Sequence, residues 1–192
     1  MHSLEPHFGW RHLYTAEEDE KSPFFGREYS EFEFTNRVYN YVIHPQWDEI
    51  GSPTLFIKIL YAEYDEKFAI LELLGEWNDC IHNDIMIFKR DILEKIMSFG
   101  INKFIIVGEN ILNFHYDGDD YYAEWKEDIG DGWIALLNFQ PHVLAELKHN
   151  ALLGFFETGG KLNDIGWRTF TPLQLFQVVE MNIKKRINAQ KE

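Results

Sequence analysis

The sequence predicts a mixed α/β fold: a mixed sheet of five to seven strands, with a βαβ crossover and helices packed on the sheet. The main evidence is a strand–helix–strand unit in residues 68–107. Residues 68–74 and 103–107 are short apolar runs, which are typical of buried strands. The apparent hairpins before this unit and the alternating strands and helices after it favour mixed rather than purely parallel pairing.

The segment between the two runs is predicted to be a helix. Its apolar residues recur at steps of three and four, so they share one helical face. Asn78, Asp79 or Asn83 could cap its start, and Gly100 suits its C-terminal cap. The apolar positions are Ile81, Ile85, Phe88, Ile92, Ile96 and Phe99.

The remaining elements follow from shorter patterns. Polar and apolar residues alternate around Glu31-Phe-Glu-Phe34, which predicts a half-exposed strand within 29–43. Residues 54–64 predict a strand that forms a hairpin with the run at 68. A turn is expected at 108–110, a helix over 121–127, strands over 133–139 and 152–156, and a helix over 141–150. Thr171-Pro172 suits the start of a final amphipathic helix.

A chain of 192 residues is one domain, or one domain with an extension. Residues 1–27 have no clean period and are predicted to form an irregular N-terminal arm. Residues 28–192 are predicted to form a single globular α/β domain that ends in the amphipathic helix.

Composition limits the location and the partners. The net charge of −14 argues against nucleic acid, because phosphates repel such a surface. We see no secretory signal and no apolar stretch long enough to span a membrane. We therefore expect a cytoplasmic protein without a membrane partner. Cys80 is the single cysteine, which excludes an intramolecular disulfide.

Acidity combined with 16% aromatic residues is a hint of a protein-binding surface. Solubility alone is the competing explanation of the acidity. A homodimer is a further possibility, through the final helix or an exposed edge strand.

Part of the chain resembles the anti-sigma-factor antagonist (STAS) domain. The resemblance covers residues 68–107 and lies in Leu73-Leu-Gly-Glu76, the following helix and Phe104-Ile-Ile-Val107. It implies an α/β fold that binds proteins. In that family the loop after the second strand carries a phosphorylatable Ser. The corresponding residues 108–115 contain no Ser or Thr, so the resemblance implies no phosphorylation switch here.

The best candidate site is the C-terminal edge of the sheet, where ligands of open α/β sheets bind. Polar residues at both joints of the 68–107 unit would converge there; the alternative is that they are helix caps and turn formers. The predicted ligand-binding residues are Glu76, Trp77, Asn78, Asp79, Glu109, Asn110 and Asn113.

A metal site is a second candidate. His142, Glu146 and His149 are spaced by four and three residues, so one helical face could present all three to Zn²⁺. Cys80 near a helix start could be a reactive thiol, but a lone cysteine is usually a small buried hydrophobe. No glycine-rich nucleotide motif is present, and we predict no cofactor.

These observations predict a non-enzymatic cytoplasmic module for protein interaction or regulation. One alternative is a small-ligand binder or enzyme that uses the polar groups at the edge of the sheet. Another is an acidic inhibitor or immunity-type protein that masks a basic partner. No coherent catalytic set emerges, so an enzyme is the less favoured reading.

Overall fold

The computed structural model describes residues 4–189 and confirms the mixed α/β fold. Its main sheet has the strand order β3-β4-β5-β6-β7. The first two pairs are antiparallel, and β5–β6 and β6–β7 are parallel. A separate two-stranded sheet pairs β1 (Arg37–Val38) with β2 (Tyr41–Val42). The five strands are β3 (Asp48–Glu49), β4 (Leu55–Glu63), β5 (Phe68–Asn78), β6 (Lys103–His115) and β7 (Trp133–Leu137).

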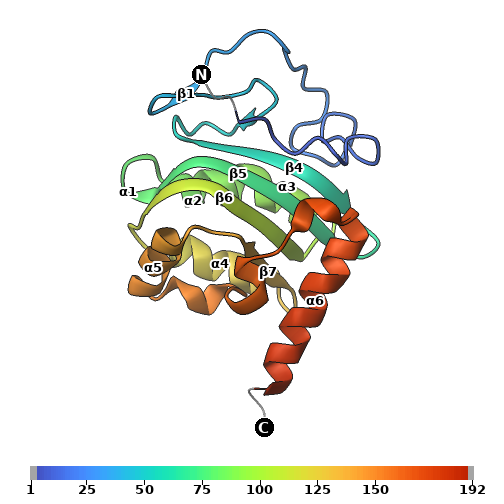
Figure 1. Cartoon of the computed structure of the whole chain (residues 1–192), viewed down its shortest axis with the longest axis vertical. Helices are drawn as coiled ribbons and strands as arrows, with labels where there is room; N and C mark the ends of the chain where they lie inside the picture. The colour runs from blue at the N-terminus through green and yellow to red at the C-terminus, as the bar shows by residue number, and fades with distance from the viewer. Residues whose placement is uncertain (1–3, 190–192) are drawn as a thin grey trace.

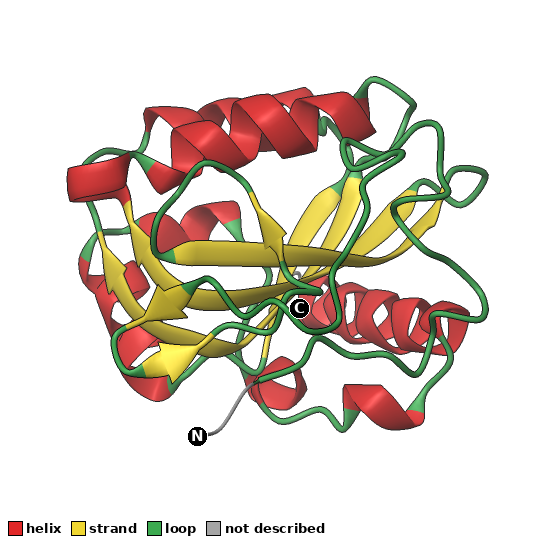
Figure 2. Ribbon diagram, turned by 90° about the horizontal axis from the view of Figure 1, so that it is seen from above, coloured by secondary structure: helices red, strands yellow, loops and turns green. Residues whose placement is uncertain are grey.

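Helices cover both faces of the main sheet. The crossover from β5 to β6 lies on one side and α6 on the other (Figure 2). The crossover comprises α1 (Asp79–His82), α2 (Asp84–Ile87), the π-helix η1 (Phe88–Leu93) and α3 (Glu94–Met97). After β6 come α4 (Asp120–Asp128), α5 (Pro141–His149), the 3₁₀ helices η2 (Leu152–Phe155), η3 (Gly160–Asn163) and η4 (Trp167–Thr169), and α6 (Pro172–Ala189).

Alternation along the strands separates two cores. Leu71 and Leu73 of β5 face the crossover, α4 and α5, whereas Phe68 and Ile70 face α6. Phe68 stacks on Phe176 of α6, with the ring centroids 4.2 Å apart. All eleven residues of β5 are buried, as expected for a central strand that is covered on both faces.

The predicted crossover helix is interrupted. Four of its six apolar positions are buried as expected: Ile85, Phe88, Ile92 and Ile96. The other two are not, because Ile81 is 74% and Phe99 40% exposed. Asn83 has a left-handed backbone (φ 53°) that separates α1 from α2, so Ile81 leaves the common face.

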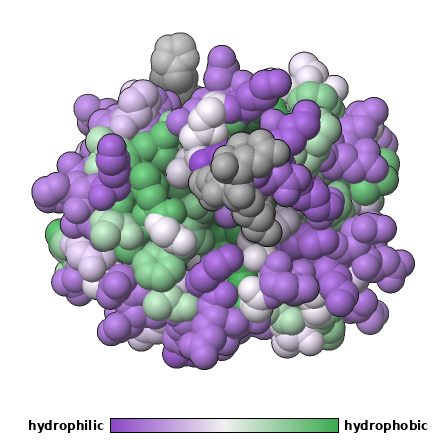
Figure 3. Space-filling view, turned by 90° about the horizontal axis from the view of Figure 1, so that it is seen from below, coloured by the Kyte–Doolittle hydropathy of each residue, from purple (hydrophilic) through white to green (hydrophobic). Residues whose placement is uncertain are grey.

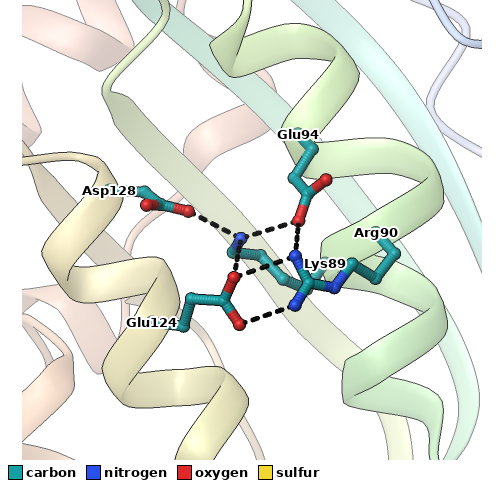
Figure 4. Close-up of polar contacts among 5 residues, drawn as sticks. All are labelled: Lys89, Arg90, Glu94, Glu124 and Asp128. Carbon is teal, nitrogen blue, oxygen red and sulfur yellow. Dashed lines mark hydrogen bonds and ion pairs between the residues drawn. The ribbon is translucent and has the colours of Figure 1, made fainter.

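The π-helical turn places Lys89 inside the structure. Its side chain is fully buried, and Nζ lies 2.7 Å from Asp128 Oδ2 and 3.0 Å from Glu94 Oε1. Burial alone would lower the pKa of Lys89, but these hydrogen bonds raise it overall. Arg90 bridges Glu94 and Glu124 beside it, so η1 and α4 are joined by one charged cluster (Figure 4).

Three predicted elements are wrong. Residues 29–36 are loop, and only β1 and β2 form within 29–43, because the alternating side chains around Phe32 are exposed on both sides. The turn expected at 108–110 lies inside β6, which continues through two register shifts against β5. Residues 152–155 form η2 rather than a strand, and the neighbouring Glu157 instead makes an isolated bridge to β7.

Residues 4–36 lie beside β4 as an irregular segment (Figure 1). Trp10 packs in the core on the α6 side of the sheet, and Ala16 and Phe24 pack in the core on the crossover side. This irregular segment extends beyond the predicted arm of residues 1–27, and we call residues 4–36 the N-terminal arm. The Trp10 indole Nε1 donates to Phe170 O at 3.0 Å, and Arg27 pairs with the buried Asp48 at 2.9 Å. The arm is therefore tied to the sheet and to the segment before α6.

Within residues 4–189, none of the helices combines the length and apolar character needed to cross a bilayer.

We predict that Lys89→Glu lowers the free energy of unfolding by about 3–5 kcal/mol, because it buries an unpaired charge among three carboxylates. Lys95→Glu on the exposed side of α3 should change it by less than about 0.5 kcal/mol. Urea unfolding followed by circular dichroism measures both. Equal effects of the two substitutions would contradict the role of Lys89.

Candidate functional site

A pocket of about 400 Å³ lies at the C-terminal edge of the parallel strands. β5 and β6 end side by side there, since Asn78 pairs with His115 in the register. We call this cavity the edge pocket. Its walls come from α1, the end of β6 with the residue after it, and α5. The lining residues are Cys80, residues 113–116, His142, Glu146, His149 and Asn150.

Main-chain contacts hold the walls of the edge pocket in place. Asn78 caps α1 by accepting from Ile81 N at 3.0 Å, which sets the position of Cys80. The Cys80 thiol donates to Tyr116 O at 2.8 Å. On the opposite wall, Pro141 begins α5, and His142 Nε2 lies 2.7 Å from Leu112 O.

A polar network lies behind the pocket wall. Glu76 accepts from Asn78 Nδ2 at 2.8 Å and lies 3.2 Å from His115 Nε2. The Tyr39 hydroxyl donates to Glu76 and accepts from Asn113 Nδ2 at 2.9 Å. Burial would raise the pKa of Glu76, but the hydrogen bonds from Tyr39 and Asn78 lower it overall, so this carboxylate is charged at neutral pH.

The structure separates the predicted ligand-binding residues. Asn113 lines the edge pocket, and Glu76 lies directly behind it. Asn110 pairs with Leu74 in the middle of β6 and does not line the edge pocket. Trp77 is 2% exposed and packs in the core against Phe88 and Phe114.

Asp79 is an anchor for the start of the crossover. It accepts hydrogen bonds from Tyr122 Oη at 2.6 Å, Ile85 N at 2.9 Å and Trp77 Nε1 at 3.0 Å. Burial raises the pKa of Asp79 to about 6, and the three donors offset part of that shift. The contacts of Asn78 and Asp79 therefore agree with the alternative interpretation, in which these residues cap helices and form turns.

The residues of the predicted metal site share the edge pocket, but they do not form a coordination site. Among residues 4–189, no three His, Cys, Asp or Glu side chains are placed to hold a metal ion. His142 is directed to the Leu112 carbonyl. His149 and Glu146 remain available on the same wall.

A buried carboxylate on the α6 face escaped the sequence analysis. Glu72 in the middle of β5 has a fully buried side chain, which accepts from His7 N at 2.8 Å. Arg168 of η4 lies 3.5 Å from Glu72 and also pairs with Glu109. Glu109, predicted at the edge, thus belongs to this cluster, where Trp167 Nε1 also donates to it at 3.3 Å.

The environment shifts the two carboxylates of this cluster in opposite directions. Burial raises the pKa of Glu72 to about 7, with partial offset from His7 N and Arg168. Burial also acts on Glu109, but the hydrogen bond and charge of Arg168 lower its pKa overall. The His7 ring lies edge-on to the rings of Trp10 and Trp167, with the ring centroids 4.9 Å apart in both pairs. Burial lowers the pKa of His7, and the positive charge of Arg168 lowers it further.

Comparison with protein-family models and with curated proteins found no match to this chain.

We predict that Glu72→Gln stabilises the protein at pH 8. The folded-state pKa of Glu72 is raised, so its protonation stabilises the fold at low pH, and that stabilisation is lost as the pH rises towards 7. Since one pKa unit corresponds to about 1.4 kcal/mol, the advantage of Glu72→Gln over the parent should grow by about 1 kcal/mol between pH 6 and pH 8. Urea unfolding at both pH values measures this difference.

Glu109→Gln is the matched control, because it faces the same arginine. Its depressed folded-state pKa stabilises the ionised form, so this substitution should destabilise the protein at pH 8. Parallel pH profiles for the parent and Glu72→Gln would show that Glu72 does not titrate with a raised pKa.

Proposed function

We propose that the protein binds a small polar molecule in the edge pocket. The observation that carries this proposal is a 400 Å³ cavity at the C-terminal edge of β5 and β6. Open α/β sheets bind ligands at this edge, and pockets of about 300–1,000 Å³ are typical of ligand sites. This was the alternative reading of the sequence, and the cavity is the feature that favours it over a flat interaction surface.

The lining indicates the chemistry of the ligand. His115, His142 and His149 contribute imidazoles, which can donate or accept hydrogen bonds near neutral pH. The lining contains Glu146 but no Lys or Arg, and the charged Glu76 lies behind His115. This electrostatic balance favours a neutral or amine-bearing ligand over an anion.

We assign binding and no catalytic step. A cysteine nucleophile needs a base within hydrogen-bond reach. Among the hydrogen bonds of residues 4–189, Cys80 has the Tyr116 carbonyl as its partner rather than an imidazole. The thiol is exposed on the pocket wall and supplies a contact surface.

We predict that neutral and amine-bearing fragments bind in the edge pocket and shift the amide resonances of Cys80, His115 and His149, whereas carboxylate fragments of equal size do not. Two-dimensional ¹H–¹⁵N NMR on the whole chain measures the shifts. His149→Ala should weaken binding about tenfold, as expected for one lost polar contact of about 1.4 kcal/mol. Lys148→Ala, next to it on α5 and exposed, should leave binding unchanged.

Two results would refute this proposal. One is a fragment screen in which no compound shifts the pocket resonances. The other is a set of hits whose affinity is the same in the parent and in His149→Ala.

A second proposal keeps the interaction module that the sequence favours. Among the side chains that the structure describes, twelve large hydrophobic ones are exposed, and eight of these lie in residues 4–41; Phe32 is 87% exposed. Glu31 and Glu33 flank Phe32 and are also exposed. We propose that this acidic and aromatic loop docks a basic protein, in line with a cytoplasmic regulatory or inhibitory role and with the STAS-like resemblance.

We predict that affinity capture at low salt from the native host recovers a basic protein that is released at high salt, because charge pairs at an exposed surface are screened. Binding of that protein, purified, should be lost with Phe32→Ser. Phe99→Ser, at an exposed phenylalanine outside the loop, is the control. A partner that binds Phe32→Ser as well as the parent would contradict the docking role of the loop.

A further inference from the structure

A second cavity of about 320 Å³ lies where the end of α6 meets the loop that begins η3. Its walls are residues 159–162 on one side and Asn182, Lys185 and Arg186 on the other. We call it the basic pocket. Figure 3 views the molecule from below, which is the side toward which α6 runs in Figure 1, and shows hydrophilic and hydrophobic areas side by side on this surface.

Three of the residues that line the basic pocket are basic. Lys161, Lys185 and Arg186 line it, and its lining contains no carboxylate. Among residues 4–189, none of these three cations has a carboxylate oxygen within 4.0 Å, whereas the neighbouring Lys184 pairs with Glu180 at 2.7 Å. In a chain of net charge −14, three cations around one cavity that have no acidic partner among the described residues suggest a site for an anion.

The helix dipole accounts for part of this charge. Cations stabilise the C-terminal end of a helix, which carries about half a negative charge. Lys184, Lys185 and Arg186 all lie near the end of α6, and Lys161 comes from a different element. The dipole therefore leaves most of the positive charge of the pocket uncompensated.

The glycine loop leaves room for a ligand. Gly159 and Gly160 both have positive φ angles, and a Cβ placed at Gly160 would meet no atom within 4 Å. Asn163 Oδ1 accepts from Gly159 N at 2.9 Å, and Arg186 Nη1 donates to Thr158 O, so the loop is held against α6. Arg186 Nη2 lies about 4.0 Å from the position of a Cβ at Gly159.

We infer that the basic pocket binds a small phosphate-bearing molecule. Arginine and lysine are the side chains that recognise phosphate groups, through charge-assisted hydrogen bonds. A small anion in the pocket interacts with the local cations, because exposed charges are screened beyond about 8 Å at physiological salt. A polyanion such as a nucleic acid or an anionic membrane would extend over the acidic remainder of the surface and be repelled.

The test uses inorganic pyrophosphate and the whole chain of 192 residues. Isothermal titration calorimetry and ¹H–¹⁵N NMR should show binding that shifts the amides of Gly159, Gly160 and Lys161 and weakens as salt rises. Lys161→Gln/Lys185→Gln should weaken binding at least about tenfold, since each charge-assisted hydrogen bond contributes more than a neutral one. Lys95→Gln/Lys148→Gln removes the same charge at exposed positions elsewhere and should change binding less than about twofold.

The proposals for the basic pocket and for the edge pocket are tested independently. His149→Ala should leave pyrophosphate binding unchanged, because the two pockets share no lining residue. Absence of binding at millimolar pyrophosphate, or equal loss in both double variants, would overturn the inference. Tighter binding of DNA or phosphatidylserine vesicles than of pyrophosphate would also overturn it, because the site would then recognise a polyanionic surface.

Discussion

Complete burial of β5 is the constraint on which the other parts of the structure depend. Apolar side chains on both faces of one strand must be covered, and each buried large side chain contributes about 1.5–3 kcal/mol. The crossover helices, α4 and α5 cover one face, α6 covers the other, and the N-terminal arm adds buried side chains to both cores. The irregular arm is therefore a structural layer of the fold, although its own residues form almost no regular secondary structure.

The same strand carries charge into the interior. Glu72 and Glu76 are both buried, and an ionised carboxylate without partners would be very costly there. Glu72 receives the His7 amide and faces Arg168, whereas Glu76 receives the Tyr39 hydroxyl and the Asn78 amide. The partners of Glu72 come from segments far from β5 in the chain, so the positions of the arm and of η4 are set by polar contacts as well as by packing.

Local patterns predicted the parts of the fold that rest on local physics. β5, β7, α4, α5 and α6 follow from apolar runs and helix signals; Asn78 caps α1, and Pro141 is the first residue of α5. The alternation around Phe32 predicted a strand that does not form, because this segment has no partner strand. The register shifts through which β6 continues have no signature in the sequence. The edge of the sheet, predicted as the site, holds a cavity that Asn113 lines. The Glu72 cluster could not be predicted, because its contacts join residues 65 and 96 positions apart.

The arm also has a consequence for the order of events during synthesis. Trp10 donates its indole hydrogen to a carbonyl 160 residues later in the chain. On the ribosome, the arm must wait for β5 and then for η4 before its docking surface exists. Its aromatic side chains are exposed through most of translation, which is when chaperones or an early-binding partner would meet them.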